Sequence, residues 1–523
     1  MALEEAKLAK DIDLQRPITE YPFWLERLHD INYTEIIAKR EQWTDTEEFP
    51  PTDTSLFDNQ LKRTEQHDKW LNYEWRRASE VIGERMQIFE KDTVSPKDIV
   101  QGYCGDCYFL SSISSLAEYP ERVKKIFLTK EVNEAGCYAL QLYVNGEPHV
   151  VVVDDYLPWH KINKTWAFSR CSSDTEIWVQ LLEKAWAKVF GNYMRIEGGQ
   201  AGEALPALTG APVQMLDHRD ITNYDKLWTQ LYGYDKKGYV MATTVQSSQV
   251  FKSKGQVERT GLLDTHAYSV VSCSEVLVGK ETVRLMKIRN PWGEQEWKGP
   301  WSDGSDKWTQ ETMDQVNFEC KDDGVFFIQF EDYLRFFYMT TVCKYVEGGD
   351  LSVCEDEHQQ SKYCLQGFTL QKDVKSQVIV TLNQIHARFM KKEGLLYQYA
   401  PFKLILAKVV KERDVYPQSQ TPEGEVIAQV DGDLGKMSAQ VDIELEGLTA
   451  GDYLIFIQAR QYGVQNPLRK LITNIYAADP IQIKRLSTNP KVNNVFYRMD
   501  MWVYNKVYSD SIYQAPKWSR STQ

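Results

Sequence analysis

The pattern of apolar and polar positions changes twice along the chain. Residues 76–205 are mostly helical in periodicity, whereas residues 206–340 carry runs of Val, Ile and aromatic residues punctuated by Gly and Pro, which are typical of strands. Over residues 345–510, many short apolar runs alternate with turn signals, as expected for a β-sandwich. A polar N-terminal extension (1–75) and a short tail (511–523) complete the chain. We therefore predict an α+β protein, in which a helical lobe and a β-rich lobe with a cleft between them precede a β-sandwich.

Two helices dominate the prediction for the first lobe. One begins at Cys107, after which apolar residues recur at helical spacing until Pro120, where we expect it to end. The other lies within SDTEIWVQLLEKAWAKVFG, at 173–191. There Ser173 and Glu176 fit a capping box and predict the start of that helix.

Composition and charge limit the function classes. The chain has 523 residues and a formal net charge of −13, and the negative charge disfavours nonspecific nucleic-acid binding. It has no apolar run of about 18 residues that would predict a transmembrane helix, and MALEEAKLAKDIDLQ has no signal-peptide pattern. The nine cysteines are scattered, which favours free thiols in a reducing compartment. We expect a cytoplasmic protein without nucleic-acid partners.

The segment QGYCGDCYFLSS, at 101–112, carries the strongest chemical signal. It places Cys107 at the start of an apolar helix, where the helix dipole favours the thiolate, the form that attacks carbonyl groups. Gln101 lies six residues upstream, and a turn could bring its amide back to the cysteine. The amide and the backbone N–H of Cys107 would then form an oxyanion hole.

Two further motifs follow in the β-rich region. His266 opens the strand of DTHAYSVV, and Asn290 closes the strand of IRNPWGEQEW. Cys, His and Asn in this order form the papain-like arrangement, in which Asn accepts from the imidazole and fixes its tautomer. Taken singly, each has a simpler interpretation: a buried small residue, a core histidine or a turn residue. Cys104 and Cys107 also form a C-x-x-C pair, which would suit redox chemistry or half of a zinc site, but no second pair has zinc spacing.

These motifs resemble those of the calpain family of cysteine proteases. The chain reads QGYCGDCYFL, THAYSVV and IRNPWGEQEWKGPWSD, where calpains have QGxxGDC, GHAYSV and IRNPWGxxEWxGxWSD. The resemblance spans about residues 45–340 and continues more weakly over 345–510. It implies a papain-like two-lobed protease core followed by a calpain-type β-sandwich, and hydrolysis of protein substrates. The catalytic residues that it implies are Cys107, His266, Asn290 and Gln101.

The resemblance also assigns residues around the catalytic group. Trp292 matches the tryptophan that in this family lies near the triad and can block it, and Gly199 matches a glycine that binds substrate through its backbone. The family usually has Gly directly before the histidine, where this chain has Thr265. A Cβ atom there narrows the place where the substrate backbone would lie.

Calpains bind two calcium ions in the protease core, and this chain retains part of each site. Asp98 and Glu176 match acidic ligands in the first lobe, where Thr93 replaces a glycine. In the second lobe Val325 replaces an acid, so the resemblance implies a weaker second site. Its remaining acidic ligands are Glu296, Asp303 and Asp323.

We expect no EF-hand domain of the kind found in conventional calpains. The segment DGDLGK, at 431–436, is too short for an EF-hand loop and is expected to form a hairpin turn. No small subunit that pairs through EF-hands is therefore expected. Two alternatives remain open: a transglutaminase-like acyl transferase that uses the same thiolate, and a non-catalytic calpain-like adaptor that acts through its β-sandwich.

Overall fold

The computed structural model describes most of the chain and divides it into two compact units. The core unit comprises Glu20–Glu347 and Arg388–Tyr397, and the sandwich unit comprises Met1–Thr19, Gly348–Ala387 and Gln398–Gln523. Within the described residues, no helix is long and apolar enough to cross a membrane. Residues 495–504 of the predicted β-sandwich, Thr93 and most of the predicted turn at 431–436 lie outside the described residues. The described residues are 31–59, 61–90, 94–245, 259–359, 364–390, 402–410, 423–431, 440–459 and 468–486.

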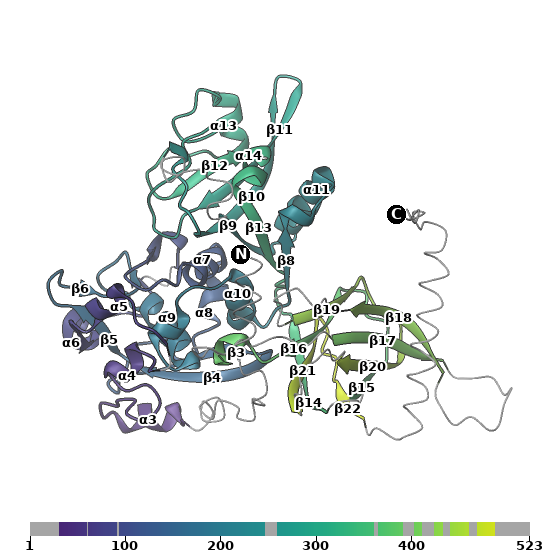
Figure 1. Ribbon diagram of the computed structural model, residues 1–523, viewed down its shortest axis with the longest axis horizontal. Helices are drawn as coiled ribbons and strands as arrows, with labels where there is room; N and C mark the ends of the chain where they lie inside the picture. Colours follow the sequence, from purple (N-terminus) through teal and green to yellow (C-terminus); the bar gives the residue numbers. More distant parts are fainter. Residues whose placement is uncertain are drawn as a thin grey trace, which may run out of the picture. The chain divides into compact units, whose positions relative to one another are not determined.

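The first lobe of the core unit is built around helix α7 (Cys107–Ala117), which is buried from Tyr108 to its end. Helix α9 (Trp178–Phe190) meets α7 where Trp186 stacks on Phe109, with ring centroids 5.0 Å apart. Helix α10 (Ala201–Thr209) contacts α7 and strand β3 (Cys137–Val144), which forms a hairpin with β4 (Glu147–Asp154) (Figure 1). The other elements of this lobe are α3 (Tyr33–Lys39), α4 (Asp53–Leu56), α5 (Glu65–Trp70), β1 (Tyr73–Arg77), α6 (Ala78–Ile82), β2 (Ile99–Val100), α8 (Pro120–Lys124), β5 (Tyr156–His160), β6 (Thr165–Trp166) and β7 (Arg170–Cys171).

The predicted capping box at the start of α9 is wrong. The helix starts at Trp178, and its N-cap residue, Ile177, makes no side-chain cap. The Glu176 carboxylate instead accepts a hydrogen bond from the backbone N–H of Glu90, at 2.6 Å. A β-bridge between Gln87 and Glu176 keeps the chain extended at this point, so the long-range pairing prevails over the local capping pattern.

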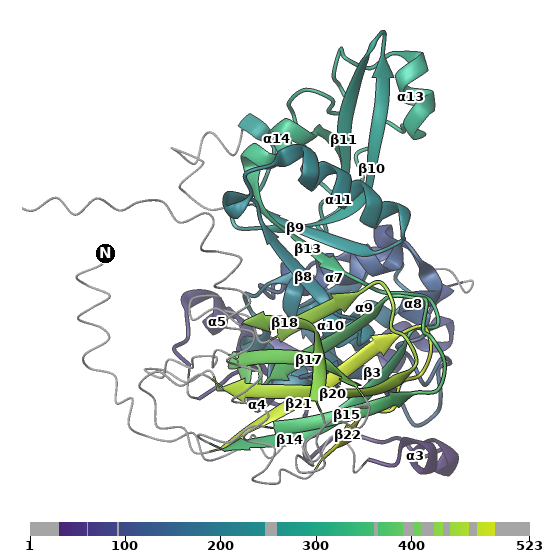
Figure 2. The ribbon, with the colours of Figure 1, turned by 90° about the vertical axis from the view of Figure 1, so that its right-hand side faces the viewer.

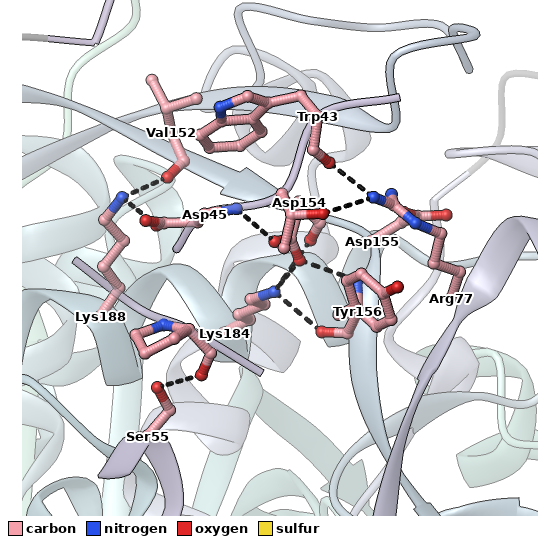
Figure 3. Close-up of polar contacts among 12 residues, drawn as sticks. Trp43, Asp45, Ser55, Arg77, Val152, Asp154, Asp155, Tyr156, Lys184 and Lys188 are labelled. Carbon is pink, nitrogen blue, oxygen red and sulfur yellow. Dashed lines mark hydrogen bonds and ion pairs between the residues drawn. The ribbon is translucent and has the colours of Figure 1, made fainter. Parts of the chain in front are cut away.

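A buried ionic network joins α9 to strand β4 and to the loop around Asp45 (Figure 3). Lys184 pairs with Asp154, and Lys188 pairs with Asp45 at 2.6 Å. The backbone N–H of Asp45 donates to Asp154 at 2.8 Å, which links the two pairs. The paired side chains are at most 2% exposed, so the network fixes the register of α9 against the hairpin.

The second lobe is one six-stranded sheet with the strand order β12-β11-β10-β9-β13-β8, and Figure 1 shows α11 and α14 beside it. Strands β10 and β11 are neighbours and antiparallel, so the start of β10 lies next to the end of β11. The apolar core of the sheet includes Tyr268, Ile288 and Phe326, all fully buried. The elements are β8 (Val213–Asp217), α11 (Tyr224–Lys236), β9 (Val240–Val245), β10 (Ala267–Val278), β11 (Glu281–Arg289), α13 (Gln310–Val316), β12 (Val325–Gln329), α14 (Phe330–Phe336) and β13 (Phe337–Cys343).

The sandwich unit contains two antiparallel sheets, as predicted, with the orders β14-β21-β16-β19 and β18-β17-β20-β15-β22 (Figure 2). Alternate residues of β16, Val378, Val380 and Leu382, share one apolar core with Leu404 and Ile455 of the other sheet. The strands are β14 (Asp350–Gln359), β15 (Cys364–Leu370), β16 (Val378–Gln384), β17 (Phe402–Val410), β18 (Glu423–Asp431), β19 (Gln440–Leu445), β20 (Gly451–Ala459), β21 (Leu468–Ala477) and β22 (Lys484–Arg485).

Candidate active site

The loop that leads into α7 is folded tightly against the first lobe. A Cβ atom on Gly102 would lie 2.1 Å from the carbonyl oxygen of Phe168, so only glycine fits there. Cys107 is the first residue of α7, as the sequence predicted. Burial raises the pKa of its thiol, although the backbone N–H groups of Ala267, Tyr108 and Cys107 act in the opposite direction. The thiol of the first lobe therefore lies against Ala267, the neighbour of His266.

His266 and Asn290 are brought together by the pairing of their strands. His266 directly precedes β10 and Asn290 directly follows β11. The imidazole Nε2 and the Asn290 Oδ1 are 2.9 Å apart, and the Asn290 Nδ2 donates to the carbonyl of Glu294 at 2.6 Å and to that of Gln295 at 3.1 Å. This fixes Oδ1 as the acceptor, so Nε2 carries the imidazole proton and Nδ1 is left as the basic atom.

Both members of the thiol–imidazole pair are neutral near pH 7 in this conformation. Burial lowers the pKa of His266 to about 4, and burial raises that of Cys107 above its ordinary value. His266 is only 4% exposed, so water cannot stabilise an imidazolium ion here. Formation of the ion pair requires a change in the surroundings of these two groups.

Trp292 connects His266 to Gln101. Its ring centroid lies 5.0 Å from that of His266, and its Nε1 donates to the Gln101 Oε1 at 2.7 Å. The Nε2 of Gln101 donates to the carbonyl of Cys104 at 2.9 Å. Both ends of the Gln101 amide are thus engaged within the protein, and one N–H of its Nε2 remains for another acceptor.

Gly199 and Thr265 lie in the backbone around this group. A Cβ atom on Gly199 would come within 2.7 Å of the Tyr108 ring, which explains the need for glycine. Thr265 has a φ of 53°, a left-handed conformation that is strained for a β-branched residue. The geometry therefore accounts for the glycine that calpains have at this position.

Sequence reasoning missed two buried carboxyl groups in the surroundings of Cys107, those of Asp106 and Glu183. Asp106 precedes Cys107 and is fully buried, and the charge of Glu183 in α9 opposes its ionisation. Burial raises the pKa of Asp106, and burial raises that of Glu183 to about 7. The available signal was an acidic residue within the apolar face of a predicted helix.

Asp98 and Glu176, the candidates for the first calcium site, lie close enough for their charges to interact. Burial raises the pKa of Glu176 to about 7, and the charges of Asp98 and Glu90 add smaller contributions in the same direction. Asp98 accepts a hydrogen bond from the backbone N–H of Ser95 at 2.7 Å. Two carboxylates that repel each other fit a divalent cation, although Thr93 lies outside the described residues.

The candidates for the second calcium site surround the loop before β12. Glu296 accepts from the backbone N–H groups of Asp323 and Gly324 at 3.1 and 2.8 Å, and burial, with repulsion from Asp303, raises its pKa to about 7. Asp323 pairs with Lys97 of the first lobe at 2.6 Å. In the part of the chain that the structure describes, no three His, Cys, Asp or Glu side chains converge on one point.

Comparisons with known proteins agree with the motifs. The family described as "Calpain family cysteine protease" matches residues 43–344, more than half of the chain. Calpain-type cysteine protease DEK1 of Arabidopsis thaliana is 32% identical over 66% of this chain and 17% of its own length. Calpain clp-4 of Caenorhabditis elegans is 30% identical over 63% of this chain and 46% of its own. The rat Calpain-1 catalytic subunit is 32% identical over 56% of this chain and 41% of its own.

The chain thus spans less than half the length of these curated relatives. Among solved structures, the cysteine protease and lectin-like domains of Cwp84 from Clostridium difficile align over 93% of this chain and 90% of that one. The identity is 11% and the TM-score is 0.20, too low to bear on the fold.

Proposed function

The chain belongs to the calpain family of cysteine proteases, and on that premise we propose that it is a calcium-dependent endopeptidase that makes limited cuts in protein substrates. The observation that carries the proposal is the His266–Asn290 pair, 2.9 Å apart, beside the thiol at the start of α7. This arrangement supplies a nucleophile, a base and a group that orients the base. All nine cysteines are free thiols in the structure, which supports a reducing, cytoplasmic location.

The proposed mechanism proceeds through a thioester. His266 Nδ1 takes the proton of the Cys107 thiol, and the sulfur attacks the scissile carbonyl carbon. The backbone N–H of Cys107 and the Gln101 amide donate to the oxyanion. The imidazolium then protonates the leaving amine, and water, deprotonated by His266, hydrolyses the thioester. Asn290 holds the imidazole in the required tautomer throughout.

Calcium is proposed to bind Asp98 and Glu176 in one lobe and Glu296, Asp303 and Asp323 in the other. When bound, it supplies positive charge that neutralises clustered carboxylates and orders the loops that carry them. Asn290, Trp292 and Glu296 lie within seven residues of one another in the chain. A change in this loop would therefore move Trp292, release the Gln101 Oε1 from its indole and leave the Gln101 side chain free to reorient toward the oxyanion.

The test is cleavage of casein with and without calcium by the wild type, Cys107→Ala and Cys104→Ala. Loss of the nucleophile should abolish cleavage, because triad members act as a unit, whereas Cys104→Ala should retain it. Cleavage by Cys107→Ala at the wild-type rate would exclude Cys107 as the nucleophile. Incorporation of an amine in place of hydrolysis would indicate an acyl transferase, and failure of an epoxysuccinyl peptide to label Cys107 would indicate an adaptor.

A further inference from the structure

Arg388 lies in the chain between two strands of the sandwich unit, β16 and β17, yet it belongs to the core unit. The core unit includes Arg388–Tyr397 together with Glu20–Glu347. Arg388 lies in a short 3-10 helix, Ala387–Met390, and it is only 7% exposed. Its neighbour Phe389 contacts Phe190 of α9, with ring centroids 4.7 Å apart.

The Arg388 guanidinium binds a row of backbone carbonyls. Its Nη1 donates to the carbonyl of Arg195 at 2.6 Å and to that of Glu197 at 3.4 Å, and its Nη2 donates to the carbonyl of Gly198 at 2.6 Å. One carboxylate balances its charge, because Nε and Nη2 also donate to Glu203 Oε2 at 3.1 and 2.6 Å. Most of the donors therefore fix main-chain geometry, a role that the planar fork of arginine performs and lysine cannot.

The same stretch of backbone is attached to residues 101–106, the loop that leads to Cys107 and is called the nucleophile loop below. Gly198 N–H donates to the carbonyl of Gly105 at 2.8 Å, and the N–H of Gly105 donates to Glu197 Oε1 at 3.1 Å. His67 Nε2 contacts the other oxygen of Glu197 at 2.5 Å. The segment 197–199 is therefore held by the nucleophile loop on one side and by Arg388 on the other.

Gly199 lies directly against the Arg388 guanidinium. A Cβ atom at Gly199 would be 2.5 Å from Arg388 Nη2 and 2.7 Å from the ring of Tyr108, and the guanidinium lies 5.2 Å from the centre of that ring. Gly198 has a φ of 64°, and two consecutive glycines have wide conformational freedom unless their carbonyls are fixed. Arg388 supplies that restraint.

We propose that Arg388 is a positioning residue that holds Glu197–Gly199 in the conformation in which the Gly199 backbone pairs with the substrate. The proposal rests on the proposed peptidase function, because it takes Gly199 as a substrate-binding residue. Its consequence is that substrate binding by the core unit depends on the segment of chain that follows strand β16.

The test compares Arg388→Lys with Arg485→Ala, a matched control. Arg485 is an arginine of the sandwich unit, and its exposed side chain pairs with Asp356 at 3.0 Å. Lysine can still pair with Glu203, so Arg388→Lys should fold. Its kcat/KM for a fluorogenic peptide should fall by about 10- to 100-fold, the usual cost of a misplaced substrate. Alkylation of Cys107 by iodoacetamide, which needs no substrate-binding backbone, should keep the wild-type rate, while labelling by an epoxysuccinyl peptide slows.

Hydrogen exchange of the Gly198 amide provides a readout that does not depend on cleavage. It should be faster in Arg388→Lys than in the wild type or Arg485→Ala. If the wild type cleaves no peptide but exchange is faster, the peptidase assignment fails while the role of Arg388 on this loop is supported. The inference would be overturned if Arg388→Lys kept the wild-type kcat/KM and the wild-type exchange rate of the Gly198 amide. It would also be overturned if iodoacetamide and the epoxysuccinyl peptide labelled Cys107 of this variant with equally reduced rates.

Discussion

At the scale of single residues, burial decides the charge of Cys107 and His266, the proposed nucleophile and base. The pKa of His266 is lowered to about 4 and that of Cys107 is raised, so both groups are neutral between these pKa values. In chelator, the rate of Cys107 alkylation by iodoacetamide should therefore keep rising with pH from 7 to 9, because only the thiolate reacts. Site-resolved mass spectrometry after timed labelling measures this rate. A plateau below pH 7 would instead mean that a thiolate–imidazolium pair already exists without calcium.

The strained backbone of Thr265 leads to a stability prediction. Relief of the strain at its φ of 53° is worth about 1–3 kcal/mol, and the entropy of a glycine costs about 0.5–1 kcal/mol. Thr265→Gly should therefore raise the free energy of unfolding, by up to about 2 kcal/mol, in urea denaturation. Thr265→Ala is the control, since its Cβ atom keeps the strain. Equal stability of the two variants would show that this conformation is not strained.

At the scale of elements, the buried network of Figure 3 joins α9 to the rest of its lobe. Lys188 pairs with Asp45 at 2.6 Å and with Glu48 at 2.8 Å. Lys188→Ala would leave buried carboxylates unpaired and should lower the free energy of unfolding by about 3–5 kcal/mol.

A matched lysine on the surface serves as the control for Lys188. Lys39 pairs with Glu35 at 3.0 Å, and both side chains are at least 60% exposed, so Lys39→Ala should cost less than about 0.5 kcal/mol. Guanidinium denaturation of the core unit measures both variants. Equal losses would mean that the network around Lys188 adds nothing beyond a surface ion pair.

Elements that rest on local patterns could be predicted from the sequence. The helix starting at Cys107 and the sandwich strands follow from the spacing of apolar residues, and His266 and Asn290 were found by their motifs. The capping box at Glu176 failed, because a partner 86 residues away in the chain, Glu90, takes that carboxylate. Arg388 was missed for the same reason, since its carbonyl partners lie more than 185 residues earlier and no local pattern encodes such a pairing.

At the scale of the whole molecule, the structure divides the proposed machinery between two lobes of the core unit. Cys107, the proposed nucleophile, begins α7, and His266, the proposed base, directly precedes the start of β10. The lobes meet where the Ser269 hydroxyl donates to the carbonyl of Ser111 at 2.9 Å and where Lys97 pairs with Asp323 at 2.6 Å. A misplacement of about 1 Å can cost about 10²-fold in rate, so contacts between the lobes can control activity.

The acidic residues near these contacts should contribute unequally to calcium activation. Asp323 already pairs with Lys97, so the lysine competes with calcium for this carboxylate at the proposed second site. Val325 offers no side-chain ligand there. Glu176 has an exposed fraction of only 3% and lies beside Asp98, whose charge opposes its ionisation. A cation at the first site would relieve that repulsion directly.

Glu176→Ala should therefore raise the calcium concentration for half-maximal casein cleavage more than Asp323→Ala does. We expect an increase of at least about 10-fold for Glu176→Ala, since the loss of even an outer-shell partner of a metal lowers metal affinity or activity by that factor. Lys97→Ala should lower the calcium concentration for half-maximal cleavage, because it releases Asp323. Glu319→Ala is the control, because this exposed acid pairs with Lys321 at 2.5 Å and is not a proposed ligand. A larger effect of Asp323→Ala would reverse the ranking of the sites. Full activity in excess chelator would exclude a calcium switch and leave a protease whose lobes are aligned by protein contacts alone.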